Sequence, residues 1–107
     1  MNAPAQLTEQ DMRIVANQHH YRARRAALEA ADPVLFARVT STADAVSPAQ
    51  TRAQEAWKAM RAAIANYADA EDIAHLTREY RAACDASMVA WFAMMDALEE
   101  SWARGFT

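Results

Sequence analysis

Residues 57–76 read WKAMRAAIANYADAEDIAHL, and within this stretch one helix must end and another begin. The first apolar stripe consists of Trp57, Met60, Ile64 and Tyr67, and the second of Ile73, Leu76, Tyr80, Cys84, Met88, Trp91, Met95, Leu98 and Trp102. At about 100° per residue the two stripes lie roughly 165° apart. One straight helix would have to exchange its buried side midway, so we predict a break near residues 68–70. Asp69 with Asp72 offers a weak cap there.

Start and stop signals place the other helix ends. Thr8 and Asp11 resemble a capping box, and Pro33 suits the first turn of a helix that restarts after a break. Residues 47–50 combine an N-cap serine, a proline at the first helical position and a glutamine at the third. Gly105 is expected to end the last helix. We therefore predict four helices, near residues 8–31, 33–43, 48–67 and 70–104.

Composition points to a single all-α domain. The chain has 107 residues, 28 alanines, one glycine and three prolines, and alanine is the best helix former. We expect a flexible tail at residues 1–6 and one helical domain over residues 7–107. Ten arginines stand against one lysine, a bias typical of GC-rich bacterial or phage coding sequences.

The cellular location is inferred from what the sequence does not show. A single cysteine, Cys84, excludes an intrachain disulfide and favours a reducing compartment. No signal peptide is evident. The longest apolar run, residues 88–95, is far shorter than the roughly 20 residues of a membrane span. We therefore expect a cytoplasmic protein without membrane contact.

The predicted last helix is longer than the helices that would cover it. Its extent is about 50 Å, against about 36 Å for the first helix and about 30 Å for the third. Val89 and Phe92 fall on its charged side, beside Asp85 and Asp96, where solvent is expected. The far side of this helix is lined by Ala82, Ala86, Ala90, Ala93 and Ala97. A helix that is apolar on nearly all sides is usually surrounded by protein. We therefore expect a second chain here, either a homodimer or another protein.

Charge is unevenly distributed along the chain. Residues 1–61 carry 8 Lys and Arg against 6 Asp and Glu, whereas residues 62–107 carry 3 against 8. This asymmetry favours an orienting surface or a head-to-tail pairing of two subunits.

The first predicted helix contains the most basic segment. Arg13, Asn17, His20 and Arg24 share one helical face, with Arg22 and Arg25 nearby. Such a face suits a solvated surface, an acidic protein partner, or nucleic-acid phosphates. His19, on the opposite side, is expected at the edge of the core.

No set of residues indicates catalysis. Asp72, His75 and Glu79, with Glu71, share a helix face, but the carboxylate dimetal sites of helical bundles need two such motifs. A metal-binding bundle therefore remains an alternative, and no cofactor is expected. Cys84 is expected to pack in the core, and no phosphate loop, nucleophile elbow or zinc-finger spacing is present.

The fold prediction is an all-α, small helical bundle of three to four helices, with a long C-terminal helix and a homodimeric state. The function prediction is a non-enzymatic interaction protein: a regulator, inhibitor or adaptor that binds another macromolecule through helical surfaces. Its expected partner-binding residues are Val89, Phe92, Asp85, Asp96, Arg13, His20 and Arg24. A nucleic-acid-binding regulator is the alternative.

Overall fold

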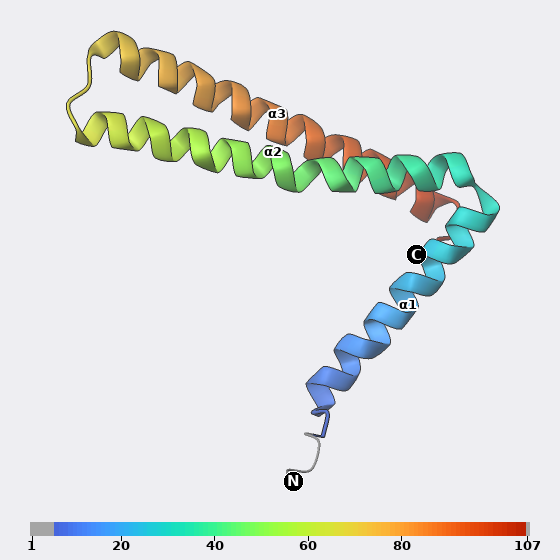
Figure 1. The fold of residues 1–107 in the computed structure, drawn as a ribbon. Coiled ribbons are helices and arrows are strands. Elements are labelled where there is room, and N and C mark those ends of the chain that lie inside the picture. Colours follow the sequence, from blue (N-terminus) through green and yellow to red (C-terminus); the bar gives the residue numbers. More distant parts are fainter. Residues whose placement is uncertain (1–5, 107) are drawn as a thin grey trace.

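The computed structural model describes residues 6–106, and within that part of the chain it contains three helices and no strand (Figure 1). They are α1 (Glu9–Ala31), α2 (Pro33–Ala65) and α3 (Ala70–Ala103). The all-α prediction is confirmed. Of the predicted tail, residues 1–5 lie outside the described residues.

The predicted cap of α1 is present. The Thr8 hydroxyl accepts a hydrogen bond from the Asp11 backbone N–H, and the Asp11 carboxylate accepts one from the Thr8 backbone N–H, both at 3.0 Å. Each bond satisfies a backbone donor that a helix start leaves without a partner. α1 therefore begins where the sequence predicts.

The predicted break between a second and a third helix is wrong. α2 runs without interruption from Pro33 to Ala65 and carries Pro48 inside the helix. Val46 and Ala49, on either side of the proposed start signal, are both buried. Packing of these neighbours against α3 outweighs the local preference of Ser47 and Pro48 for a new helix start.

The predicted break before α3 is confirmed, although its capping residue is not. α2 ends at Asn66, and Tyr67 adopts a left-handed backbone conformation with φ of 54°. The backbone N–H groups of Tyr67 and Ala68 donate to the carbonyls of Ile64 and Ala63, which closes the α2 C-terminus. Asp69 makes no side-chain cap bond to α3. Tyr67 is 93% exposed, not part of a buried stripe.

The C-terminus of α3 ends at a glycine as predicted. Gly105 has φ of +90°, and its N–H donates to the carbonyl of Trp102, while the Phe106 N–H donates to the carbonyl of Ser101. Glycine adopts this left-handed conformation without the steric cost of a Cβ.

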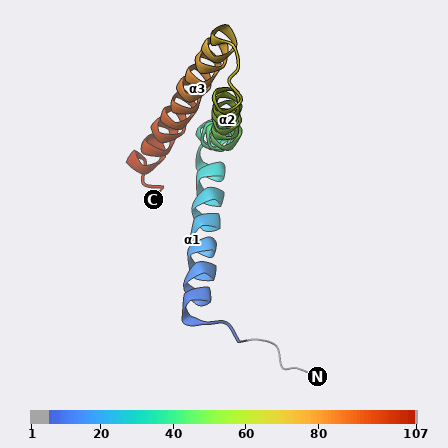
Figure 2. The same cartoon turned by 90° about the vertical axis from the view of Figure 1, so that its left-hand side faces the viewer.

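Helices α2 and α3 form an antiparallel hairpin along a seam in which alanine, serine and threonine alternate with larger apolar residues (Figures 1 and 2). On each helix the buried and half-buried residues recur in alternating steps of three and four, the spacing of a two-helix coiled coil. The seam consists of Leu35, Val39, Thr42, Val46, Ala49, Ala53, Ala56, Met60 and Ala63 on α2, and of Ile73, Leu76, Tyr80, Ala83, Ser87, Ala90, Met94, Ala97 and Ser101 on α3. Small side chains let two helix backbones approach closely.

The residues of this seam differ from the core that the sequence predicts. The expected stripe on α3 supplies only its first members to the seam, Ile73, Leu76 and Tyr80. Met88, Trp91 and Trp102 are exposed instead. Among the alanines predicted to admit another helix, Ala90 and Ala97 do so, but the helix that approaches them is α2 of the same chain.

The chain is extended, not a compact bundle. α1 leaves the corner at Asp32 and runs away from the hairpin at an acute angle (Figures 1 and 2). The radius of gyration is 20.7 Å, against about 13 Å for a compact chain of this length. We call the concave space between α1 and the hairpin the V. Within residues 6–106, no helix has both the length and the apolar character that crossing a membrane requires.

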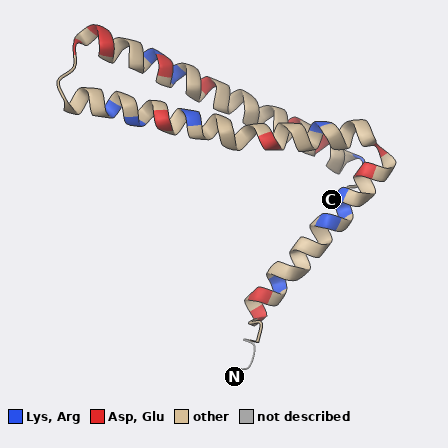
Figure 3. Cartoon of the chain, viewed as in Figure 1, with Lys and Arg blue, Asp and Glu red and all other residues tan. Residues whose placement is uncertain are grey.

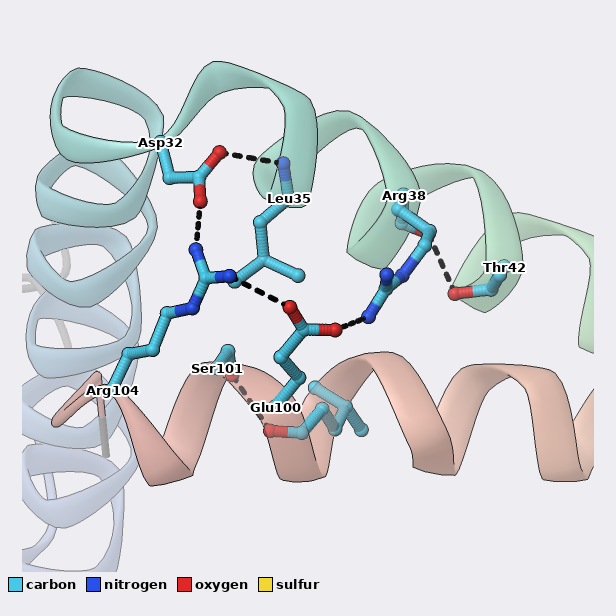
Figure 4. A network of polar contacts seen from close by, with 8 residues as sticks. Asp32, Leu35, Arg38, Thr42, Glu100, Ser101 and Arg104 are labelled. Atoms are coloured by element: carbon cyan, nitrogen blue, oxygen red, sulfur yellow. Dashed lines mark hydrogen bonds and ion pairs between the residues drawn. The ribbon is translucent and has the colours of Figure 1, made fainter.

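A polar network holds the corner of the V (Figure 4). The carboxylate of Asp32 accepts a hydrogen bond from the Leu35 backbone N–H at 3.0 Å and pairs with Arg104 of α3. Glu100 pairs with Arg104 at 2.8 Å and also with Arg38 of α2. One linker residue, one α2 residue and two residues near the end of α3 are thereby tied together.

Acidification is expected to weaken this corner. The hydrogen bond from Leu35, with the charge of Arg104, lowers the pKa of Asp32 below its ordinary 3.8. Asp32 therefore contributes stability that is fully present above about pH 3.8 and is lost as the pH falls through its lower folded-state pKa. Thermal melting midpoints measured from about pH 6 to about pH 2 check this. Asp32→Asn retains an N-cap acceptor without a titrating group, so its midpoint should fall less. Equal acid sensitivity of the two proteins would contradict the role of Asp32.

Candidate interaction surface

The predicted partner-binding residues of the last helix share one exposed face. Asp85, Val89, Phe92 and Asp96 follow one another at helical spacing on α3, and all four are exposed. Val89 is 68% and Phe92 58% exposed. We call these four residues the α3 outer face. It presents two large apolar side chains between two carboxylates, with no contact from the rest of the described chain to explain them.

A second exposed apolar surface was not foreseen. Trp57 and Ile64 of α2, together with Met88 and Trp91 of α3, are exposed although the sequence analysis assigned them to the core. We call these four residues the apolar hairpin face. The alternating three-and-four spacing of the alanines could have revealed it. Because residues at that spacing form the contact between α2 and α3, the large apolar residues beside them stay exposed.

The other flank of the hairpin is charged. Arg38 and Glu100, which form the ion pair at the corner, each lie one position outside the seam on the side opposite the apolar hairpin face. The sequence of α3 has no charged residue between Asp85 and Asp96, and Figure 3 shows an uncharged stretch in the middle of this helix. At the corner the hairpin is therefore asymmetric, with an ion pair on one flank and apolar side chains on the other.

The arginines of α1 do not form one free face. Arg13 pairs with Glu9 at 3.3 Å and His20 is exposed. Arg24 is half-buried against the hairpin, and its Nε is buried without a hydrogen-bond partner among the described residues. Arg25 lies over the rings of Tyr21 and Phe36, 5.6 and 5.4 Å from their centroids.

A cavity of about 240 Å³ lies at the corner of the V. Residues from all three helices line it: Tyr21, Arg24, Arg25, Leu28, Val39, Leu98, Ser101, Trp102 and Phe106. Its walls are mostly apolar, with two guanidinium groups at one side. The cavity lies between the end of α1 and the hairpin, beside Leu28, which is buried.

The remaining polar candidates have local partners. His75 Nε2 lies 3.0 Å from a carboxylate oxygen of Glu79, an i,i+4 pair between exposed side chains. Within residues 6–106, no three His, Cys, Asp or Glu side chains come together as a metal site. Cys84 is half-buried beside Tyr80, and a hydrogen bond with its thiol raises the pKa of Tyr80 above 10.0.

Comparison of this chain with family models, with curated proteins and with solved structures found no match.

Proposed function

We propose that this chain is a non-enzymatic interaction protein, a regulator, inhibitor or adaptor that acts by occupying a surface of another protein. The observation that carries the proposal is the amount of large apolar side chain that stays exposed on α3 and α2. Soluble monomers rarely expose contiguous apolar patches of this kind, and such patches mark interaction sites. Trp, Met and Phe are also the residues enriched at the centres of protein interfaces.

The α3 outer face is the surface proposed for the partner. Val89 and Phe92 supply apolar anchors, and Asp85 and Asp96 flank them as a polar rim. The flanking carboxylates favour a partner with basic side chains around an apolar groove. Arg13 and His20 of α1 are exposed and available to an acidic part of the same partner.

Replacing Val89 or Phe92 by aspartate is expected to abolish partner binding without loss of helicity. Each variant places a carboxylate in the desolvated centre of the interface, which weakens binding about 100-fold or more. The measurement is affinity capture on immobilised chain, with mass spectrometry of the bound proteins and circular dichroism of each variant.

Ala59→Asp is the matched control, because Ala59 is an exposed residue of α2 and not of α3, and it lies about 160° around its helix from Trp57 of the apolar hairpin face. The captured proteins should be the same as for the original chain. Retention of every captured protein by both the Val89 and the Phe92 variants would refute the α3 outer face. Capture of nucleic acid that falls steeply with salt would instead favour phosphate binding.

A further inference from the structure

Both walls of the V are apolar. Leu28 of α1, with Leu98 and Trp102 of α3, lines the cavity at the corner and so marks the inner side. Steps of seven residues keep to almost the same side of a helix. From Leu28 such steps reach the exposed Tyr21 and Ile14, and we call these three residues the inner stripe of α1. On the hairpin, Leu98, Trp102 and Ala43 line the cavities at the corner. Steps of seven residues from Leu98 and Trp102 reach Trp91 and Met88, and such steps from Ala43 reach Trp57 and Ile64. The apolar hairpin face therefore lies on the inner side of the V.

The opposite side of α1 carries a second uncovered stripe. Met12, Val15, His19, Ala23 and Ala26 recur at helical spacing and are all exposed. Met12 lies roughly 160° around the helix from Leu28 at about 100° per residue. We call these residues the outer stripe of α1. A helix that is apolar on two opposite sides needs a neighbour on each side.

The V cannot close upon itself. Asp32 is the only residue between α1 and α2, whereas antiparallel helices are joined by loops of about 2–5 residues. Pro33 restricts Asp32 to an extended backbone, which is observed with φ of −148° and ψ of 84°. The Asp32 side chain is also held by Leu35 and Arg104. α1 is therefore kept away from the apolar hairpin face of its own chain.

The exposed area matches that of one half of a stable dimer. The accessible surface is 8240 Å², against about 5,900 Å² for a compact monomer of this mass. The excess is about 2,300 Å² per chain, or about 4,600 Å² for two chains. That total lies within the roughly 2,000–5,000 Å² that obligate dimers bury.

We infer that a second copy of this chain fills the V, with each α1 inserted between α1 and the hairpin of the other copy. The inner stripes of the two α1 helices then face each other. The outer stripe of each α1 covers the apolar hairpin face of the other copy. The interface is isologous and closed, so it ends at two chains.

Charge supports this occupant. The first half of α1 carries Glu9, Asp11 and Arg13, and the second half carries Arg22, Arg24, Arg25 and Glu29, so the start of the helix is net acidic and its end net basic (Figure 3). Antiparallel pairing of two α1 helices places the acidic start of each beside the basic half of the other. It also brings carboxylates towards the corner, where the Arg24 Nε has no hydrogen-bond partner among residues 6–106.

The inference goes beyond the proposed function and does not require the α3 outer face. Its test uses Val15→Asp on the outer stripe and Trp91→Asp on the apolar hairpin face. Both residues are exposed in the single chain, so helicity by circular dichroism should persist. The measurement is absolute mass by light scattering during size-exclusion chromatography, over a dilution series.

The original chain should be a dimer, and each variant alone should show a dissociation constant raised about 100-fold or more. An equimolar mixture of the two variants should recover a dimer. In the mixed dimer, the unaltered α1 of the Trp91→Asp chain packs on the unaltered hairpin of the Val15→Asp chain, so one of the two α1–hairpin contacts is intact. Val89→Asp is the control and should remain dimeric, since Val89 lies about 160° from Trp91 around α3. Loss of partner capture by that variant, with its dimer intact, separates the two proposals.

Three results would overturn the inference. A monomeric original chain at every concentration would show that the V has another occupant. A dimeric Val15→Asp variant would show that two hairpins pair without α1. Failure of the mixture to dimerise would exclude the reciprocal contact. If either variant loses helicity, Met12→Asp and Ile64→Asp replace the pair, because both residues are also exposed.

Discussion

Replacing Ala97 by leucine is expected to destabilise the hairpin by about 1–3 kcal/mol or more. Ala97 is fully buried, with 0% exposure, in the part of the seam near the corner, one step before Ser101. Ala97 has no exposed surface to extend into, so three extra carbon atoms there must displace the facing helix. The gain in apolar area cannot offset this overlap, because tightly packed interiors have little free volume. Chemical denaturation followed by helical circular dichroism measures the change in the free energy of unfolding.

Ala82→Leu is the matched control for this prediction. Ala82 lies on the same helix but is exposed, and leucine is nearly as good a helix former as alanine. The control should therefore lie within about 0.5 kcal/mol of the original protein. If both leucine variants unfold at the same denaturant concentration, the seam does not hold the hairpin together.

The sequence predicted the helix ends that are set by nearest neighbours. The capping box of Thr8 and Asp11, the restart at Pro33 and the glycine stop at Gly105 all depend on hydrogen bonds within a few residues. The break before Asp69 was also predicted, from two apolar stripes of different phase, although three of the four residues of the first stripe, Trp57, Ile64 and Tyr67, prove to be exposed. These features need no knowledge of what packs against the helix.

The core was mispredicted because large side chains dominate a search for periodicity. Trp91 and Met88 define the most conspicuous stripe of α3, yet alanines such as Ala90 and Ala97 make its contact with α2. Which of two overlapping stripes becomes buried depends on how closely the second helix can approach. That distance is a property of the pair of helices and not of either sequence alone. The apolar hairpin face was missed for the same reason.

The direction in which α1 leaves the hairpin also could not be predicted from local sequence patterns. A linker that consists of Asp32 alone could be read from the sequence, but its angle depends on ion pairs with Arg104, which lies 72 residues later. The burial of Arg24 was also not predictable from spacing. The spacing places Arg24 on one face with Arg13 and His20, but Arg24 lies half-buried against the hairpin. The compact bundle expected from length and composition assumed that all helices of the chain pack on one another. Here one helix is held away.

Replacing Pro48 by alanine is expected to stabilise the protein by up to about 3 kcal/mol. Pro48 lies inside α2 and is exposed, so its side chain contributes little packing. Its ring removes the backbone hydrogen bond to the carbonyl of Asp44 and crowds that carbonyl. Alanine restores the bond and has the highest helix propensity. Denaturant unfolding measures the free energy, and circular dichroism should show unchanged or slightly increased helicity.

Pro33→Ala is the matched control for Pro48→Ala. Pro33 is the first residue of α2, where the backbone N–H has no helical acceptor in any case. Its replacement should be neutral or slightly destabilising, since proline also restricts the unfolded chain. If a new helix began at Ser47, as the local start signal predicts, Pro48 would occupy the same kind of position and its replacement would behave like that of Pro33. A large difference between the two variants would establish that α2 is continuous and that packing of Val46 and Ala49 against α3 overrides the start signal between them.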